Sequence, residues 1–318
     1  MSSTQQRTRN GASALAVQIA GLTFQNPIVL AAGTAGFGRE LAGVMDIDAL
    51  GGIVTKAVSP LPRAGAPAPR VAEFPNGMIN AVGLANPGLE EVRKEHLPWL
   101  SRNMRRAITI VNVIGYTVED YVEVITVLSD AAGVGAFELN VSCPNVEQGG
   151  LEFGSDLHVL GDLVRRAREA TRKPLFVKLS PVAPDIVSSA KTAVDAGADS
   201  LTLVNTVPGL VIDVVKRRPV LGFGAGGVSG NAILPIGVLA TWKVRNAVSV
   251  PLLGVGGVSS ARDALQYLIA GASLVGIGTG ALRDPGLPGR ILADLERWCS
   301  DNCTGALSEV VGSLEMPG

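Results

Sequence analysis

The sequence is poor in aromatic residues, in cysteine and in histidine. Of its 318 residues, 4% are aromatic, three are cysteines and two, His96 and His158, are histidines. Three scattered cysteines do not form a disulfide framework, so we expect a reducing compartment, the cytoplasm. Cys299 and Cys303 would share one face of a terminal helix, but no further ligands lie nearby in the sequence. We therefore interpret them as packing residues and predict no metal site.

Long runs of one kind of residue are also missing. Basic and acidic residues balance at 27 against 28, and no Lys/Arg run occurs, which argues against a nucleic-acid partner. The apolar runs are short and interrupted by Gly, Asn or Lys, so we expect no transmembrane helix. The polar opening residues lack the apolar stretch of a secretory signal. Glycine is abundant, at 39 residues, but it lies beside apolar runs, which indicates tight turns and close approach to a ligand.

Eight short apolar runs recur along the chain, with amphipathic stretches between most of them. The runs are residues 27–32, 51–58, 108–115, 136–143, 174–180, 200–206, 251–257 and 273–280. The amphipathic stretches include residues 117–131, 155–172, 183–197 and 259–271. Continuous rather than alternating apolar character predicts parallel strands covered on both sides. Eight such units fit a (β/α)₈ barrel better than an open doubly wound sheet, in one domain spanning 1–318 with residues 1–15 as a flexible tail.

Two insertions are long for a compact domain. Residues 59–88 follow the second run and residues 207–230 follow the sixth. Long segments at the carboxyl ends of barrel strands are usually lids or binding loops, so we expect both at the C-terminal face.

The ends of the predicted strands carry polar and reactive side chains. These residues are Lys56, Asn112, Asn140, Cys143, Lys178, Asn205 and Thr206. One buried amide or ammonium is often satisfied by loop backbone, but so many on one rim favour a bound ligand. Lys56 and Lys178 lie within apolar strands, and spacing alone leaves a Schiff base, an anion contact and a salt bridge open.

Glycine clusters mark the last two strand ends. GVGGVSS (254–260) and GIGTG (276–280) place bare backbone N–H groups where barrels commonly hold phosphate, and GAGGVSG (224–230) adds a third wall. Each cluster alone is a weak signal, but together they favour a phosphorylated cofactor.

Nine motifs in order resemble those of the class 1 dihydroorotate dehydrogenases, from about residue 16 to about residue 300. They are NPIVLAAGTAGFG, GGIVTKAVSP, NAVGLANPG, ELNVSCPN, VKLSP, LVNT, GGVSG, GVGGV and GIGTG. SCPNVEQGGLEFGSD and the opening VQIAGLTFQNPIVLAAGTAGFG are most similar to subgroup B. Members of that subgroup are FMN-binding catalytic subunits that work with a separate electron-transfer subunit.

The resemblance implies oxidation of dihydroorotate to orotate, with Cys143 as the base and a hydride passing to FMN. It implies that Asn140 touches both FMN and substrate and that Lys56 lies between them. The remaining implied substrate contacts are Asn80, Ala81, Val82, Gly83, Leu84, Asn145, Asn205 and Thr206. Asparagine suits a ring with carbonyl and N–H groups because its amide both donates and accepts.

The resemblance also implies the FMN site. Lys178 would lie near flavin N1, where its positive charge stabilises developing negative charge. Further implied contacts are Ala32, Ala57, Asn112 and Val204, with Gly226, Gly227, Gly256, Gly257, Gly278 and Thr279 at the ribityl-phosphate end. Many relatives carry serine where Ala32 stands, so only a backbone contact is expected there.

Cys143 and the polar N-terminus argue against class 2 enzymes, which use a serine base and a membrane-associating extension. Subgroup B passes electrons to NAD through FAD and a [2Fe–2S] cluster, which needs about four thiolates and must therefore lie on a partner. We expect a homodimer core joined by such subunits in a heterotetramer. Three alternatives stay open: a dihydropyrimidine dehydrogenase-like enzyme, a Schiff-base aldolase using Lys178, and a protein that keeps FMN without turnover.

Overall fold

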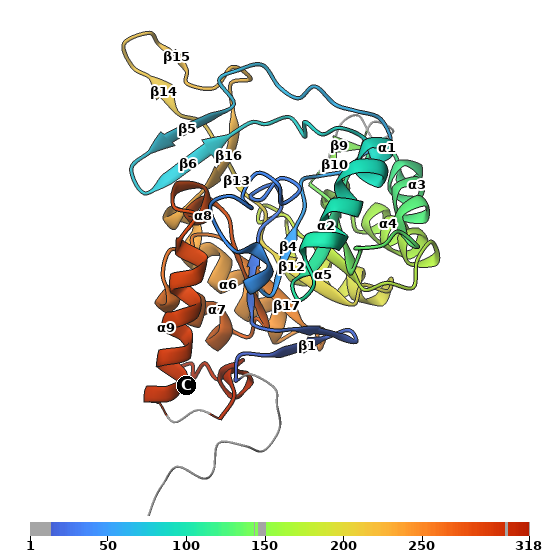
Figure 1. The fold of residues 1–318 in the computed structure, drawn as a ribbon. Coiled ribbons are helices and arrows are strands. Elements are labelled where there is room, and N and C mark those ends of the chain that lie inside the picture. The colour runs from blue at the N-terminus through green and yellow to red at the C-terminus, as the bar shows by residue number, and fades with distance from the viewer. Residues whose placement is uncertain (1–13, 143, 146–150, 303–304, 318) are drawn as a thin grey trace, which may run out of the picture.

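A closed barrel of eight parallel strands forms the centre of the protein, in a computed structural model that describes residues 14–142, 144–145, 151–302 and 305–317 (Figure 1). Around the barrel the strands are β3 (Ile28–Leu30), β4 (Gly52–Val54), β7 (Ile108–Val113), β8 (Ala136–Asn140), β11 (Leu175–Lys178), β12 (Ser200–Leu203), β17 (Leu252–Val255) and β18 (Leu274–Ile277). Each strand lies inside one of the eight predicted runs, so the (β/α)₈ fold is confirmed.

Four of the covering helices begin at side-chain caps that the sequence shows. They are α3 (Val118–Leu128), α4 (Leu157–Glu169), α5 (Ile186–Asp195) and α7 (Ala261–Ala270), capped by Thr117, Asp156, Asp185 and Ser260. Each cap accepts a hydrogen bond from a backbone N–H of the first turn, which would otherwise lack a partner. The other helices are α1 (Leu89–Glu91), α2 (Leu97–Asn103), α6 (Leu234–Arg245), α8 (Thr279–Arg283) and α9 (Leu287–Asp301). None of these five has a capping side-chain hydrogen bond, so the start signal is weaker.

The barrel interior is apolar at its amino end. Inward side chains such as Val29, Ile110 and Phe176 pack there with Ile19 and Phe24. The last two come from a hairpin of β1 (Val17–Ile19) and β2 (Leu22–Phe24), which lies below the barrel in Figure 1. A second core fills the space between strands and helices. An interior packed at its amino end is consistent with ligand binding at the carboxyl ends of the strands, where barrels of this kind bind ligands.

The last two residues of the expected tail, Ala14 and Leu15, contact the rest of the chain. Leu15 is buried, and the Ala14 carbonyl accepts a hydrogen bond from the Leu307 N–H at 2.9 Å. Residues 1–13 lie outside the described part of the chain.

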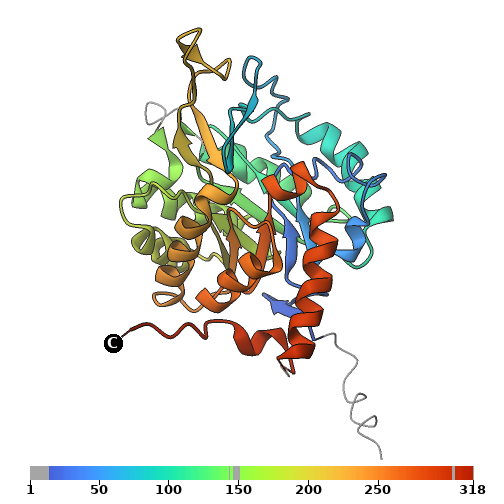
Figure 2. The same cartoon turned by 90° about the vertical axis from the view of Figure 1, so that its left-hand side faces the viewer.

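The two long insertions form one sheet. β5 (Val71–Phe74) and β6 (Gly77–Asn80) from the first pair with β13 (Val207–Gly209) and β16 (Gly226–Ser229) from the second, in the order β13-β16-β6-β5. A further hairpin, β14 (Ile212–Asp213) and β15 (Arg218–Pro219), extends beyond it. Figures 1 and 2 show this sheet and hairpin rising above the carboxyl ends of the barrel strands. Two short strands, β9 (Pro144–Asn145) and β10 (Leu151–Glu152), pair beside the same face.

Neither a bilayer-spanning helix nor a metal cluster is found in the part of the chain that the structure describes. No helix there has both the length and the hydropathy to cross a membrane. The same residues contain no group of three or more His, Cys, Asp or Glu side chains able to hold a metal ion.

Candidate active site

Alternation along the strands brings polar side chains to the carboxyl end of the barrel interior. Side chains two apart in a strand share a face. Ile110 and Phe176 belong to the inner core, and Asn112 and Lys178 follow them by two residues. The polar residues that end these strands therefore lie directly above the apolar packing.

A buried carboxylate organises this layer. Glu138, on β8, accepts a hydrogen bond at Oε1 from Asn112 Nδ2 at 2.8 Å and at Oε2 from Thr202 Oγ1 at 2.7 Å. All three residues are almost fully buried, with Glu138 1% exposed. Sequence reasoning missed Glu138 and Thr202, although a glutamate inside the apolar run AFELNV was a visible signal.

The amide of Asn112 keeps one group unsatisfied. Asn112 is 1% exposed, and no described residue donates a hydrogen bond to its Oδ1. Its Nδ2 is engaged by Glu138, and its backbone N–H donates to Thr55 Oγ1 at 3.2 Å. A buried acceptor without a donor costs free energy, so this oxygen fits a ligand that brings an N–H group.

Lys178 is also buried, only 8% exposed, at the carboxyl end of β11. In register, it pairs with Asn140 on one side and with Thr202 on the other. Within the described residues, nothing accepts a hydrogen bond from Nζ and no carboxylate lies within ion-pair distance. An ammonium without a partner among those residues, at this largely buried position, fits a ligand with acceptor or anionic groups, as the predicted FMN contact requires.

Asn140 and Asn205 meet although they are 65 residues apart. Asn205 Nδ2 donates to Asn140 Oδ1 at 3.1 Å, and Asn205 Oδ1 accepts from the Thr206 N–H at 2.8 Å. Tyr121 Oη donates to the Asn140 carbonyl at 2.8 Å, which fixes the end of β8. Two of the predicted substrate amides are thus in contact here, while their roles stay predictions.

The segment Asn80–Leu84 enters this rim from the inserted sheet. Asn80 Nδ2 donates to the Gly227 carbonyl at 3.2 Å, and the Ala81 N–H donates to the Arg70 carbonyl at 2.8 Å. The Val82 carbonyl accepts from the Ala66 N–H at 3.1 Å. After Val82 the chain turns, with positive φ values of 70° at Gly83 and 57° at Leu84.

Asn86, which was not among the predicted residues, joins the end of the first insertion to Ser59, where the insertion begins. Its Oδ1 accepts from the backbone N–H groups of Ser59 and Gly88 at 3.3 and 2.9 Å. Its Nδ2 donates to the Leu84 carbonyl at 2.9 Å and to Ser59 Oγ at 2.8 Å. The side chain therefore holds both ends of the first insertion.

Asn86→Ala is expected to lower the free energy of unfolding by about 2–3 kcal/mol, because it leaves several buried backbone groups unpaired. Urea denaturation measures this difference. Asn86→Asp is the matched control: it retains the two accepted bonds and loses the donated ones, so its loss should be smaller. Equal losses in the two variants would contradict the assignment of the accepted bonds as the main restraint.

The three glycine clusters converge at the ends of β16, β17 and β18. Thr279 Oγ1 donates to Ser229 Oγ at 2.8 Å, and Asn231 Nδ2 donates to Ser259 Oγ at 2.7 Å. Buried Tyr267 donates to the Gly256 carbonyl at 2.8 Å, and burial holds the pKa of this phenol above its usual range, so it stays a donor.

Close packing explains why several of these positions require glycine. A Cβ at Gly227 would lie 2.1 Å from Thr206 Oγ1, and one at Gly226 would lie 2.5 Å from the Asn80 carbonyl oxygen. A Cβ at Gly257 would lie 2.6 Å from the Leu234 Cβ, and φ there is +76°. Gly226 and Gly227 therefore lie against Asn80 and Thr206, which are predicted substrate residues. The role of all five glycines, with Gly256, Gly257 and Gly278, at the ribityl-phosphate end stays a prediction.

The other predicted positions are distributed as follows. Val204 is buried, and its N–H donates to the Val255 carbonyl at 3.0 Å, while Ala32, Lys56 and Ala57 are half-buried at the ends of β3 and β4. No described residue accepts a hydrogen bond from Lys56 Nζ. Cys143 lies outside the described residues, and of Asn145 only the backbone, in β9, is described.

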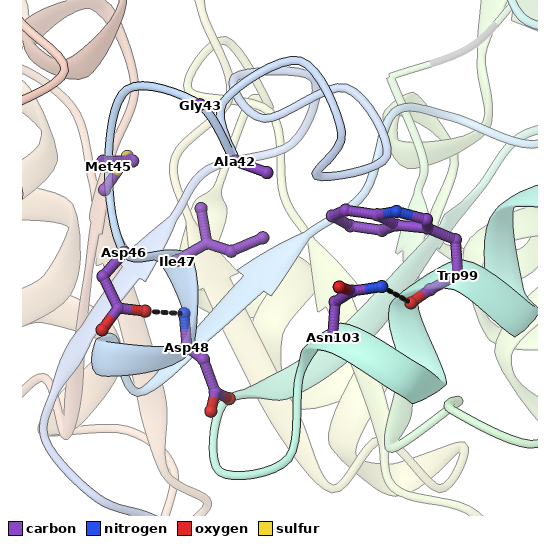
Figure 3. Close-up of a pocket in the computed structure, with 8 residues that line it drawn as sticks. All are labelled: Ala42, Gly43, Met45, Asp46, Ile47, Asp48, Trp99 and Asn103. Carbon is purple, nitrogen blue, oxygen red and sulfur yellow. Dashed lines mark hydrogen bonds between the residues drawn. The ribbon is translucent and has the colours of Figure 1, made fainter.

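A surface hollow of about 480 Å³ lies away from this rim, between residues 42–48 and α2 (Figure 3). Its lining residues are Ala42, Gly43, Met45, Asp46, Ile47, Asp48, Trp99 and Asn103. Asp48 Oδ1 accepts from the N–H groups of Arg105, Arg106 and Ala107. Burial opposes ionisation of Asp48, but these bonds outweigh it and hold its pKa below the usual range. That carboxylate therefore stabilises the backbone that leads into β7. The residues that line the hollow do not form an arrangement typical of a catalytic site.

Comparison with known proteins gives one consistent result. Residues 14–298 match the family model described as "Dihydroorotate dehydrogenase". A protein of Pelobacter propionicus is 45% identical over 301 residues, which cover 95% of this chain and 98% of the relative. One of Geobacillus kaustophilus is 47% identical over 298 residues, covering 94% and 95%. One of Geobacter sp. (strain M21) is 43% identical over 302 residues, covering 95% and 98%. All three are named "Dihydroorotate dehydrogenase B (NAD(+)), catalytic subunit".

Proposed function

This chain belongs to the dihydroorotate dehydrogenase family, and we propose that it oxidises (S)-dihydroorotate to orotate in de novo pyrimidine biosynthesis. The observation that carries the proposal is the family match over residues 14–298, which includes the whole rim of amides and lysines. We also propose that the chain is one domain built on the barrel. The predicted membership of subgroup B agrees with the names of the relatives.

We propose FMN as the flavin. When bound, FMN supplies the acceptor for the hydride that leaves the substrate. The unsatisfied Asn112 Oδ1 suits a ring N–H, and the unpaired ammonium of Lys178 suits a carbonyl or a developing negative charge. Bare backbone at Gly256, Gly257 and Gly278 suits the phosphate. The proposed site is completed by Ala32, Ala57, Val204, Gly226, Gly227 and Thr279.

We propose that Cys143 removes the proton from the substrate ring carbon, on the strength of the sequence SCPN and the family membership. The amides of Asn80, Asn140, Asn145 and Asn205 would hold the carbonyl and N–H groups of the pyrimidine. The Asn140–Asn205 bond supports this assignment because it orients two of these amides toward each other, at the ends of β8 and β12, the two strands that flank β11. Lys56 would contact both the flavin and the substrate.

We propose a partner subunit that carries FAD and a [2Fe–2S] cluster and reduces NAD. The name "catalytic subunit" of the relatives supports a partner, and three cysteines are too few for such a cluster. The tip of the inserted hairpin exposes Val214 at 81% and Val215 at 87%, which suits a surface that becomes covered on assembly. The proposed assembly is a cytoplasmic heterotetramer around a homodimer of this chain.

The purified chain, reconstituted with FMN, is expected to be yellow and to lose its visible absorbance when anaerobic dihydroorotate is added. NAD reduction should require coexpression of the partner. A colourless protein, or a spectrum unchanged by dihydroorotate, would refute the function, and NAD reduction by the lone chain would refute the partner. Faster reduction by dihydrouracil would favour the dihydropyrimidine dehydrogenase alternative, and borohydride trapping of a carbonyl substrate on Lys178 would favour the aldolase.

A further inference from the structure

Two charged side chains are buried in the barrel interior and do not form an ion pair. Among the described residues, Glu138 and Lys178 are the only Asp, Glu, Lys or Arg side chains that are buried. They lie on neighbouring strands, where Glu138 is in register with Phe176, one inward position below Lys178. The carboxylate is held instead by two neutral donors, Asn112 from β7 and Thr202 from β12.

A purely structural role for Glu138 is a poor explanation for this arrangement. Burying a carboxylate costs free energy that its hydrogen bonds must compensate, and an apolar side chain at the same position would pack without that cost. The layer below, with Ile110 and Phe176, shows that apolar packing is available in this barrel. The arrangement carries a second free-energy cost, because the buried Asn112 Oδ1 has no donor among the described residues.

The hydrogen bond determines which way the Asn112 amide faces. An amide can turn by 180° about its last torsion and exchange its oxygen and nitrogen. A carboxylate oxygen only accepts, so Glu138 requires the NH₂ group on its own side and directs Oδ1 to the other. The acceptor is thereby presented in a defined direction before any ligand arrives.

We propose that Glu138 is a positioning residue, which fixes the Asn112 amide so that Oδ1 accepts the ring N–H of the oxidised flavin. This inference rests on the proposed function only for the identity of the flavin. Its consequence is that the Asn112 amide is already oriented in the apoprotein. Little further ordering of this side chain is then needed when FMN binds.

Two variants of similar shape separate the roles of hydrogen bonding and packing. Glu138→Gln keeps an acceptor for Asn112 Nδ2 and offers its own NH₂ to Thr202 Oγ1, so FMN affinity should stay within about twofold of wild type. Glu138→Met keeps the length but frees the amide, so the FMN dissociation constant should rise about tenfold. The fluorescence of released FMN on dilution measures both, with no substrate present.

Thr202→Val and Asn112→Ala test whether the effect runs through the amide. Thr202→Val removes the other donor of Glu138, so it should lower stability while leaving FMN affinity near wild type. In the Asn112→Ala background, Glu138→Met should cause no further loss of affinity, because the residue through which Glu138 acts is gone. If Thr202→Val loses as much affinity as Glu138→Met, or if the loss persists in full without Asn112, the inference is wrong.

A pair of variants that exchanges the amide group of Asn112 and the carboxylate of Glu138 tests the same idea if Glu138→Met fails to fold. Asn112→Asp alone sets two carboxylates against each other and should weaken FMN binding about tenfold. Adding Glu138→Gln restores a donor between them and should recover most of that loss. Absence of recovery overturns the inference. A wild-type protein that binds FMN but is not reduced by dihydroorotate would refute the proposed function alone, whereas one that binds no FMN would overturn both.

Discussion

Replacing Cys143 with serine is expected to slow reduction of the bound flavin by dihydroorotate roughly 10²–10⁴-fold at neutral pH, with FMN still bound. A base must be deprotonated to accept a proton, and a free thiol has a pKa of about 8.5. A serine hydroxyl is a far weaker acid than a thiol, so much less of it is in the basic form at pH 7. The rate in the variant should therefore keep rising with pH above the range where wild type has levelled off.

Anaerobic stopped-flow absorbance at several pH values measures this prediction. Cys299→Ser is the matched control, because Cys299 is a buried thiol on α9, outside the proposed site. Burial, reinforced by Glu296 and Glu309, raises the pKa of Cys299, so this thiol stays neutral and its replacement should leave the rate unchanged. Rapid flavin reduction at neutral pH in Cys143→Ser would remove Cys143 from the role of base.

The barrel could be predicted from sequence because its signals are local. Each strand is a short continuous apolar run, and each of α3, α4, α5 and α7 starts at a Thr, Asp or Ser that caps it. The hairpin of β1 and β2 was not predicted, since its strands are only three residues long and their packing against the barrel interior is a tertiary contact.

The inserted sheet illustrates what local signals leave out. Residues 59–88 and 207–230 were recognised as long loops over the site, but their pairing was not foreseen. The contact that joins them, β6 with β16, links positions about 150 residues apart, as in the Asn80–Gly227 bond. Nothing in either segment alone specifies the other as its partner.

The candidate site divides in the same way. Strand-end position pointed to Asn112, Asn140 and Lys178, because so many polar residues at the carboxyl ends of barrel strands favour a bound ligand. Glu138 was missed because it stands in the middle of a strand, where its partners on other strands are invisible in sequence. Asn86 was missed because an asparagine in a loop has many ordinary uses, and its four bonds show only in the fold.

Lys178→Met is expected to change two quantities in opposite directions. Lys178 is 8% exposed and its ammonium has no acceptor among the described residues, so its removal should stabilise the apoprotein or leave it unchanged. The same change should raise the FMN dissociation constant by about 10–100-fold, since a hydrogen bond to a charged group contributes about 1.5–3 kcal/mol. Methionine keeps most of the length of the side chain, so no large cavity adds to either effect.

Urea denaturation of the apoprotein and FMN titration of the same preparation measure the two quantities together. Lys94→Ala is the control for loss of one positive charge, because Lys94 is 62% exposed and paired with Glu90 on the surface. It should leave FMN affinity unchanged. A destabilised apoprotein with intact FMN affinity would mean that Lys178 is structural. Preorganisation predicts that Lys178→Met raises the stability of the apoprotein and lowers its affinity for FMN. The unpaired charge destabilises the empty barrel, and only the bound ligand supplies its partner.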